Sequence, residues 1–311
     1  MFRHILVPLD GSGMAEAALP AAAFFAVKFN AAVTLLHVIE RDAPDEVHGQ
    51  PHLKKAEEAT AYLRETAARA FHPDASVALH VHTTEVDDVA ESIVAHAQEL
   101  DHDIIIMCSH GRGRALHLLF GSIAQKVISK GTLPVLVTRH GEDEKAAPFS
   151  CDSLLLPLDG DAEHTQALPP SKELARACGS MIHLLVVIPG FGDLSGQRAV
   201  TSRFLPGSIY RILEMSVQQA EDYVQSQLED LQRDGINAVT HVLRGDPAVV
   251  IEDTARKLQT GLIVMTTHGK SSMDAFWSGS VTHKLSSLGT VPILLIPVIK
   301  RQSKEDTEES S

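Results

Sequence analysis

Short apolar runs alternate with amphipathic stretches along the whole chain. In the first half, the runs Ile5–Leu9, Ala32–Ile39 and Ile104–Met107 are almost entirely apolar, which is typical of strands buried on both faces. Leu53–Phe71 instead places apolar or small residues every three or four positions, the period of a helix. Because strands and helices alternate, the pattern predicts an α/β fold whose parallel sheet is covered by helices on both faces.

The remaining segments of the first half continue this alternation. An edge strand is expected at Val77–Thr83, where the pattern alternates, and a last strand at Pro134–Thr138. Arg41–Pro51 is expected to be a polar loop. The other expected helices are Ser12–Phe29, Val86–Leu100 and Gly121–Lys130.

The second half repeats the first. HILVPLDGS (His4–Ser12) returns as SLLLPLDGD (Ser153–Asp161), and the segment Ile104–Val127 returns as Leu262–Leu285. The repeat predicts two copies of one domain, each a Rossmann-like five-stranded parallel sheet. The strands expected in the second copy are Leu154–Leu158, Met181–Ile188, Ala238–Leu243, Leu262–Thr266 and Pro292–Ile296. A polar insertion, Pro189–Gly207, and a long helix, Ser208–Arg233, distinguish this copy from the first.

The chain is long enough for two domains with a core each. We expect the first domain at residues 1–143, a charged linker from His140 to Ser150, the second domain at 150–299, and a disordered tail at 300–311.

Composition narrows the class of partner. The net charge of -13 argues against a nucleic-acid surface and against an anionic membrane. No apolar run reaches the roughly 20 residues of a membrane helix, and the start of the chain predicts a strand rather than a signal peptide. The three cysteines, Cys108, Cys151 and Cys178, lack metal-ligand spacing, so reduced thiols in the cytoplasm are expected.

The loop after the fourth strand of each half carries the first candidate chemistry. Both copies contain His-Gly-(Arg/Lys), eight further residues, and then Gly-Ser at the start of a helix. Free N–H groups and the helix dipole make such an N-terminus suitable for phosphate, although Gly and Ser also suit a simple helix cap. The residues concerned are His110, Gly111, Arg112, Gly121 and Ser122, with His268, Gly269, Lys270, Gly279 and Ser280 in the second copy.

Asp10 and Asp159 carry the second candidate chemistry. Each follows the first strand of its half, in the sequence Pro-Leu-Asp-Gly. Either Asp could cap the next helix. Ligands of open parallel sheets, however, bind beyond the carboxyl ends of the strands, where a carboxylate beside a phosphate loop suits a ribose hydroxyl or a metal ion.

These residues resemble the universal stress protein family, in tandem and over almost the whole of both halves. Nucleotide-binding members carry Gly-x-x-Gly, nine residues, and Gly-(Ser/Thr). This chain matches the second Gly, the spacing and the Gly-Ser, but has Cys108 and Thr266 in place of the first Gly. Both side chains are larger than a hydrogen and would crowd a nucleotide.

The resemblance implies an adenine nucleotide alpha hydrolase-like fold that binds ATP or AMP, with or without Mg²⁺. It implies ribose contacts from Asp10 and Asp159, adenine contacts from Val38 and Val187, and phosphate contacts from Ile123 and Val281. The other residues expected around the nucleotide are Pro8, Leu9, Met107, Pro157, Leu158 and Met265. It also implies that the last strands of the two halves meet across a pseudo-twofold axis, as an internal dimer; further homodimerisation stays open.

Three functions remain open from the sequence. The first is nucleotide binding in stress response or signalling, together with a protein partner that the sequence does not identify and without efficient catalysis. The second is a nucleotide-free interaction scaffold. The third is a slow ATP hydrolase or self-phosphorylating protein that uses Ser122 or Ser280, which the absence of a repeated general base disfavours.

Other patterns are weaker. Val264–Ser271 resembles a P-loop but has Val264 at the position of the first Gly. His80 and His82 face the same way along an edge strand, where a solvated pair is favoured over a metal site. Cys108 lies within the expected site, but Thr266 in the other copy argues against a shared thiol mechanism.

Overall fold

The computed structural model describes residues 1–109, 121–139, 149–160, 162–188, 206–267, 285 and 291–298. The expected tail, most of the expected linker and most of the expected polar insertion lie outside these residues, and so do the loops that follow the fourth strand of each half.

The first half has the expected α/β alternation. Five of its described strands lie parallel in the order β5-β2-β1-β6-β7, so β1 and β6 are neighbours. The strands are β1 (His4–Pro8), β2 (Ala32–Glu40), β5 (Val77–Val86), β6 (Ile104–Ser109) and β7 (Val135–Arg139). The helices are η1 (Ala15–Ala18), α1 (Leu19–Phe29), α2 (Ala56–Ala70), α3 (Val89–Glu99) and α4 (Ser122–Lys130).

The second half repeats this topology in the order β10-β9-β8-β11-β12, again all parallel. Its strands are β8 (Ser153–Leu158), β9 (Met181–Ile188), β10 (Ala238–Arg244), β11 (Leu262–Thr267) and β12 (Ile293–Pro297). Its described helices are η2 (Ala162–Ala167), α5 (Leu168–Cys178), α7 (Pro206–Arg233) and α8 (Pro247–Lys257).

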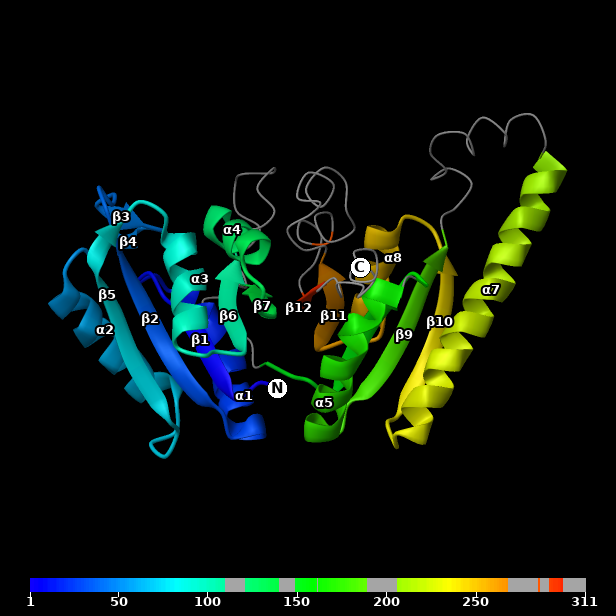
Figure 1. The fold of residues 1–311 in the computed structure, drawn as a ribbon, viewed down its shortest axis with the longest axis horizontal. Helices are drawn as coiled ribbons and strands as arrows, with labels where there is room; N and C mark the ends of the chain where they lie inside the picture. The colour runs from blue at the N-terminus through cyan, green and yellow to red at the C-terminus, as the bar shows by residue number, and fades with distance from the viewer. Residues whose placement is uncertain are drawn as a thin grey trace, which may run out of the picture.

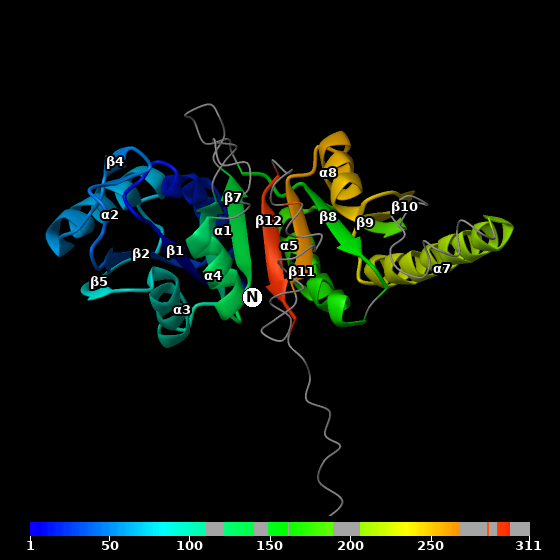
Figure 2. The ribbon, with the colours of Figure 1, turned by 90° about the horizontal axis from the view of Figure 1, so that it is seen from above.

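The two parallel sheets join at β7 and β12, which pair antiparallel, with Leu136 opposite Leu294. Within the described residues the strands therefore form one ten-stranded sheet with the seam at its centre (Figure 1). Figure 2 shows the same two strands side by side between the two halves. The expectation that the last strands meet is confirmed, and pairing leaves neither of them as an open edge.

Successive side chains of the buried strands supply the two sides of the core. Ile5 and Val7 of β1 pack on one face of the sheet, which α1, α2, α5 and α7 cover. Leu6 packs on the other face, which α3, α4 and α8 cover. Alternate residues thus enter opposite layers, which explains why the first strand of each half is apolar throughout.

Local capping shifts some elements from their expected bounds. Asp88 accepts hydrogen bonds from the backbone N–H groups of Ala90 and Glu91 at 3.1 and 3.2 Å, so α3 begins at Val89 rather than Val86, which belongs to β5. The expected loop at residues 41–51 contains two short paired strands, β3 (Glu46–Val47) and β4 (Gln50–Pro51).

Candidate functional site

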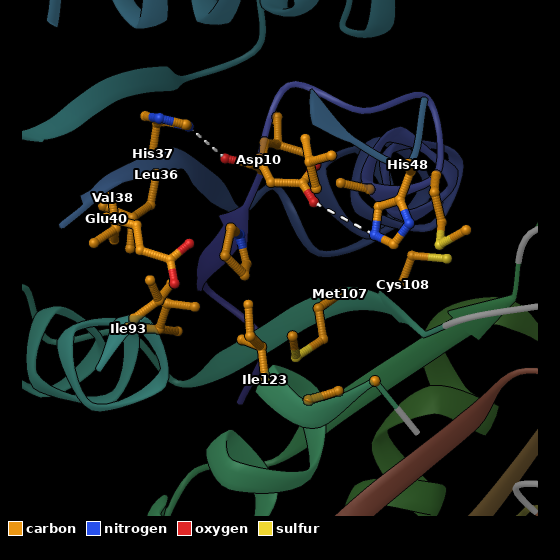
Figure 3. A pocket seen from close by; sticks show the side chains of 18 of the residues that line it. Asp10, Leu36, His37, Val38, Glu40, His48, Ile93, Met107, Cys108 and Ile123 are labelled. Carbon is orange, nitrogen blue, oxygen red and sulfur yellow. Dashed lines mark hydrogen bonds and ion pairs between the residues drawn. The ribbon is translucent and has the colours of Figure 1, made fainter. Parts of the chain in front are cut away.

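A cavity of about 300 Å³ opens at the carboxyl ends of β1, β2 and β6 in the first half. Its size is at the lower end of the range of small-molecule pockets. The walls come from these strands, the loop after β2, one side of α3 and the first turn of α4 (Figure 3). The adjacency of β1 and β6 brings the loop after β1 opposite the start of α4.

Asp10 orders the loop that follows β1. Its Oδ1 accepts hydrogen bonds from the N–H and the hydroxyl of Ser12, at 2.9 and 2.6 Å. The Ser12 hydroxyl in turn accepts from the N–H of Ala15 at 3.1 Å, at the start of η1. Ser12, rather than Asp10, therefore bonds the first N–H of η1, and one oxygen of Asp10 orients Ser12. The other oxygen, Oδ2, faces the cavity side of the loop, 4.0 Å from Nε2 of His48 (Figure 3).

A buried histidine connects this loop to the segment after β2. His37, only 1% exposed, places Nδ1 2.8 Å from the Leu9 carbonyl oxygen and Nε2 3.1 Å from that of Leu53. It therefore fixes the end of β1 against the segment that supplies His48 and His52 to the cavity wall. Nδ1 of His52 is buried without a hydrogen-bond partner, so the wall holds an unsatisfied polar atom that a ligand could pair with.

The first turn of α4 forms the opposite wall. Gly121 is the N-cap of this helix and has no side chain, so it offers no side-chain cap to the first N–H groups of the turn. Gly121, Ser122, Ile123 and Ala124 all line the cavity. Free N–H groups at the positive end of a helix dipole favour an anion at this wall.

An ion-pair cluster holds α4 against α3. Nζ of Lys130, in the last turn of α4, lies 2.9 Å from Oδ2 of Asp88, and Nζ of Lys126 lies 3.5 Å from it. The hydrogen bond from Lys130 holds the pKa of the Asp88 carboxyl below its usual range, with further lowering by a backbone hydrogen bond and by both lysine charges. These ion pairs thereby hold α4 against the start of α3, and the first turn of α4 and one side of α3 both line the cavity.

The inner part of the cavity is apolar. Val38 of β2, Ile93 of α3 and Met107 of β6 are at most 7% exposed and lie on the cavity wall. Figure 3 shows Val38 and Ile93 at the side of the cavity away from His48, with Glu40 beside them. The site therefore offers an apolar slot bordered by the Glu40 carboxylate at one end, and Asp10 with two histidines at the other.

The structure brings together nine of the residues singled out in the first half. These cavity-lining residues are Pro8, Leu9, Asp10, Val38, Met107, Cys108, Gly121, Ser122 and Ile123. His110, Gly111 and Arg112 lie outside the described residues. The cavity also uses residues that the sequence analysis did not single out, among them Glu40, His48, His52 and Ile93. The segment 41–55 shows no periodicity in the sequence that would place its histidines at the cavity.

The second half is described only in part at the equivalent position. Asp159 follows β8 as Asp10 follows β1, but it is 58% exposed and bonds Nδ1 of His164 in η2, at 2.6 Å. Pro157 and Leu158 end β8, Val187 lies near the end of β9, and Met265 and Thr266 lie near the end of β11. The remaining expected residues lie outside the described ones: His268, Gly269, Lys270, Gly279, Ser280 and Val281.

Other histidines form clusters away from the cavity. The rings of His80 and His82, on the edge strand β5, each lie 4.8 Å from the ring of His96 on α3, so they are not simply a solvated pair. Across the residues that the structure describes, no group of three or more His, Cys, Asp or Glu side chains has a geometry that could hold a metal ion. Over the same residues, no helix is both long and apolar enough to cross a membrane.

The chain contains two copies of a parallel α/β unit, joined through their last strands. A cavity lies beyond the carboxyl ends of strands 1, 2 and 4 of the first copy. These features define a tandem Rossmann-like protein with the adenine nucleotide alpha hydrolase-like fold. The chain belongs to the universal stress protein family, whose model matches residues 1–139 and again 151–297.

Known proteins agree with this assignment over the full length. A universal stress protein of Mycolicibacterium smegmatis is 24% identical over 303 residues, which cover 94% of this chain and 96% of that protein. The crystal structure of a universal stress protein from Archaeoglobus fulgidus aligns with a TM-score of 0.63 at 17% identity, over 96% of this chain and 97% of that one. A structure titled as an Archaeoglobus fulgidus universal stress protein in complex with dAMP covers 46% of this chain and 96% of its own, at 16% identity and a TM-score of 0.33.

Proposed function

We propose that the first half binds an adenine nucleotide, ATP or AMP, in the cavity between Asp10 and the start of α4, and that this binding serves stress response or signalling. The observation that carries the proposal is the order of chemistry along the cavity. An apolar slot at Val38 and Ile93 suits a purine, Asp10 suits the ribose hydroxyls, and the free N–H groups at Ser122 suit phosphate. The Gly121-Ser122 pair is also where the family's motif matches.

The proposed activity is binding without efficient turnover, because the two halves share no repeated general base beside Ser122 and Ser280. Mg²⁺ would bind together with ATP, with the phosphate oxygens as its main ligands. The described residues contain no group of three or more His, Cys, Asp or Glu side chains that could hold a metal ion. Cytoplasmic location and an unidentified protein partner stay predictions.

Cys108 favours the second candidate, a nucleotide-free scaffold. Its side chain lines the cavity at the position where nucleotide-binding relatives carry a glycine, so it takes space that a nucleotide would use. The two candidates make opposite predictions for the protein as purified. Mass spectrometry under native conditions would detect bound ATP or AMP directly for a binder and the bare chain for a scaffold.

Added nucleotide provides the quantitative test. A ligand that binds only the folded state stabilises it by about 2.7 kcal/mol at a hundredfold excess over its dissociation constant, so ATP with Mg²⁺ should raise the melting temperature and GTP should raise it less. Gly121→Val should remove the rise, because the branched side chain fills the space at the helix N-terminus. Gly279→Val applies the same test to the second half. An unchanged melting temperature with millimolar ATP would favour the scaffold.

A further inference from the structure

The second half contains a pair of cysteines that the nucleotide site does not use. Cys151 lies two residues before β8 and is fully buried, while Cys178 is the last residue of α5 and is partly exposed. Cys151 belongs to the core cluster of this face of the sheet, and Cys178 packs against the same cluster. They are far apart in sequence, so only the fold brings the two sulfurs into contact.

Backbone contacts hold the two segments together. After α5, Gly179 takes a left-handed conformation at φ 72°, and Ser180, 2% exposed, donates its hydroxyl to the carbonyl oxygen of Cys151. The N–H of Met181 then bonds the carbonyl oxygen of Asp152 at 3.0 Å, where β9 begins to pair with β8. The turn after α5 is thus fixed to Cys151 and Asp152, so the backbone of the fold holds the two cysteines near each other.

The two thiols differ in reactivity. The hydrogen bond from Cys151 lowers the pKa of the Cys178 thiol, burial opposes this, and the charge of Lys28 on α1 adds to the lowering. The same hydrogen bond and burial raise the pKa of Cys151. Cys178 is therefore the thiol that ionises and that solvent reaches, and Cys151 is the protonated neighbour behind it.

We propose that Cys151 and Cys178 form a redox-active dithiol that a hydroperoxide converts to an intramolecular disulfide. The Cys178 thiolate attacks the peroxide O–O bond, giving a sulfenic acid and, for hydrogen peroxide, one water after protonation of the departing oxygen. The Cys151 sulfur then attacks the sulfenic sulfur. The S–S bond forms, the S–O bond breaks, and the hydroxyl leaves as a second water with the proton of Cys151. The two thiols lose two electrons and the peroxide gains them.

The position of the pair suggests what oxidation changes. Cys151 follows Phe149, whose ring packs 5.2 Å from that of Phe24 on α1 of the first half. A disulfide between Cys151 and Cys178 would link the residues next to this Phe149–Phe24 contact covalently to the end of α5. The segment that the disulfide closes contains β8 and the loop that carries Asp159.

The test treats the full chain with hydrogen peroxide, unfolds it, alkylates the remaining thiols and measures the intact mass. The wild type should pass from three alkylated cysteines to one, and a digest should contain a cross-linked peptide pair with Cys151 and Cys178; a reducing dithiol should restore all three. Cys108→Ser is the matched control and should still lose two thiols.

Cys178→Ser should abolish the disulfide while it leaves the fold intact, because the residue is partly exposed and ends a helix. Its melting curve, compared with that of the reduced wild type, checks the fold. Lys28→Gln should slow the oxidation, because it removes the positive charge near the thiolate. The proposal is overturned if the oxidised wild type keeps three alkylatable thiols, or if the cross-linked peptide contains Cys108.

Discussion

Oδ2 of Asp10 lies 4.0 Å from Nε2 of His48, across the mouth of the cavity in the first half. Asp159, the repeat partner of Asp10, instead bonds His164, five residues further along the chain in η2. The same carboxylate thus faces a histidine from a distant segment in one half and a local histidine in the other. The two halves share a topology but differ in how the proposed ribose-binding Asp is held.

Asp10→Asn should weaken ATP binding while the fold is kept. The amide oxygen can still accept from Ser12, so the loop stays ordered, but the charge that would bind ribose hydroxyls and that faces His48 is lost. Hydrogen bonds to a charged group contribute about 1.5–3 kcal/mol, so we expect a loss of affinity of at least about tenfold. Isothermal titration measures it.

Asp159→Asn is the matched control for this substitution. If nucleotide binds only in the first half, affinity and stoichiometry should match the wild type. A strong effect of Asp159→Asn together with none of Asp10→Asn would move the binding site to the second half.

Gly11→Ala should destabilise the protein more than Gly160→Ala. Both glycines follow the Asp of their half and have positive φ, 92° and 86°, where an L-residue costs about 1–2 kcal/mol. A Cβ on Gly11 would also lie 2.9 Å from Cγ and Cδ1 of Leu53, whereas a Cβ on Gly160 would have no atom of the described residues within 4 Å. Leu53 would have to move, and its carbonyl bonds His37.

Denaturant unfolding of the two glycine variants isolates the steric contribution, since the backbone strain is common to both. The Gly11 variant should also bind ATP more weakly, because the shifted segment carries His48 and His52. Equal free energies of unfolding for the two variants would show that Leu53 adapts without cost.

Mild acid should lower the stability of the folded chain. Burial lowers the pKa of His80, and the charges of His96 and His82 lower it further against an opposing effect of Glu99. Burial, and then His241, lowers the pKa of His183, and burial lowers that of His241. When the folded-state pKa of a histidine lies below the unfolded value near 6.5, the unfolded chain binds more protons in mild acid. The contribution of these histidines to the free energy of unfolding is therefore present above pH 6.5 and is lost as the pH falls below it.

His241→Gln isolates one part of this effect. The amide keeps a hydrogen-bonding group beside His183, whose Nδ1 lies 3.0 Å from Nε2 of His241, but cannot become charged. The melting temperature of this variant should fall less than that of the wild type between pH 7.5 and 5.5. His72→Gln is the control, because the His72 side chain is 70% exposed in a loop. Parallel pH profiles for wild type and His241→Gln would refute the assignment.

The sequence predicted the strands well because their apolar runs reflect a local cause, burial on both faces of a parallel sheet. The repeat then fixed the equivalent elements of the second half, and the β1–β6 adjacency placed Asp10 opposite Ser122. The start of α3 was predicted too early, although Asp88 followed by Glu91 is a recognisable capping signal.

The parts of the site that the sequence analysis missed depend on tertiary contacts. His37 lies in an otherwise apolar strand, so its sequence context does not indicate a structural role. Its ring nitrogens contact the carbonyl oxygens of Leu9 and Leu53, and only the fold brings these carbonyls to the ring. The contact between Cys151 and Cys178 likewise requires the turn after α5 to fold back on β8. Neither relation has a periodicity or spacing that a sequence pattern could show.

The last prediction concerns the seam. Val135, Leu136 and Val137 of β7 pair with β12, and all three are at most 2% exposed in the whole chain. In a fragment of residues 1–143, which we propose as the first domain, β7 would become an open apolar edge. The fragment should therefore dimerise through antiparallel pairing of two β7 strands, or aggregate, while the whole chain has this edge already paired within itself.

Analytical ultracentrifugation of the fragment at micromolar concentration measures this. Val137→Pro in the fragment is the matched variant: proline lacks the N–H that a strand pair needs, so it should reduce dimerisation if pairing is through β7. Circular dichroism checks that the variant keeps its helices. A wild-type fragment that sediments as a stable monomer would mean that each half folds independently and that the seam contributes little to either.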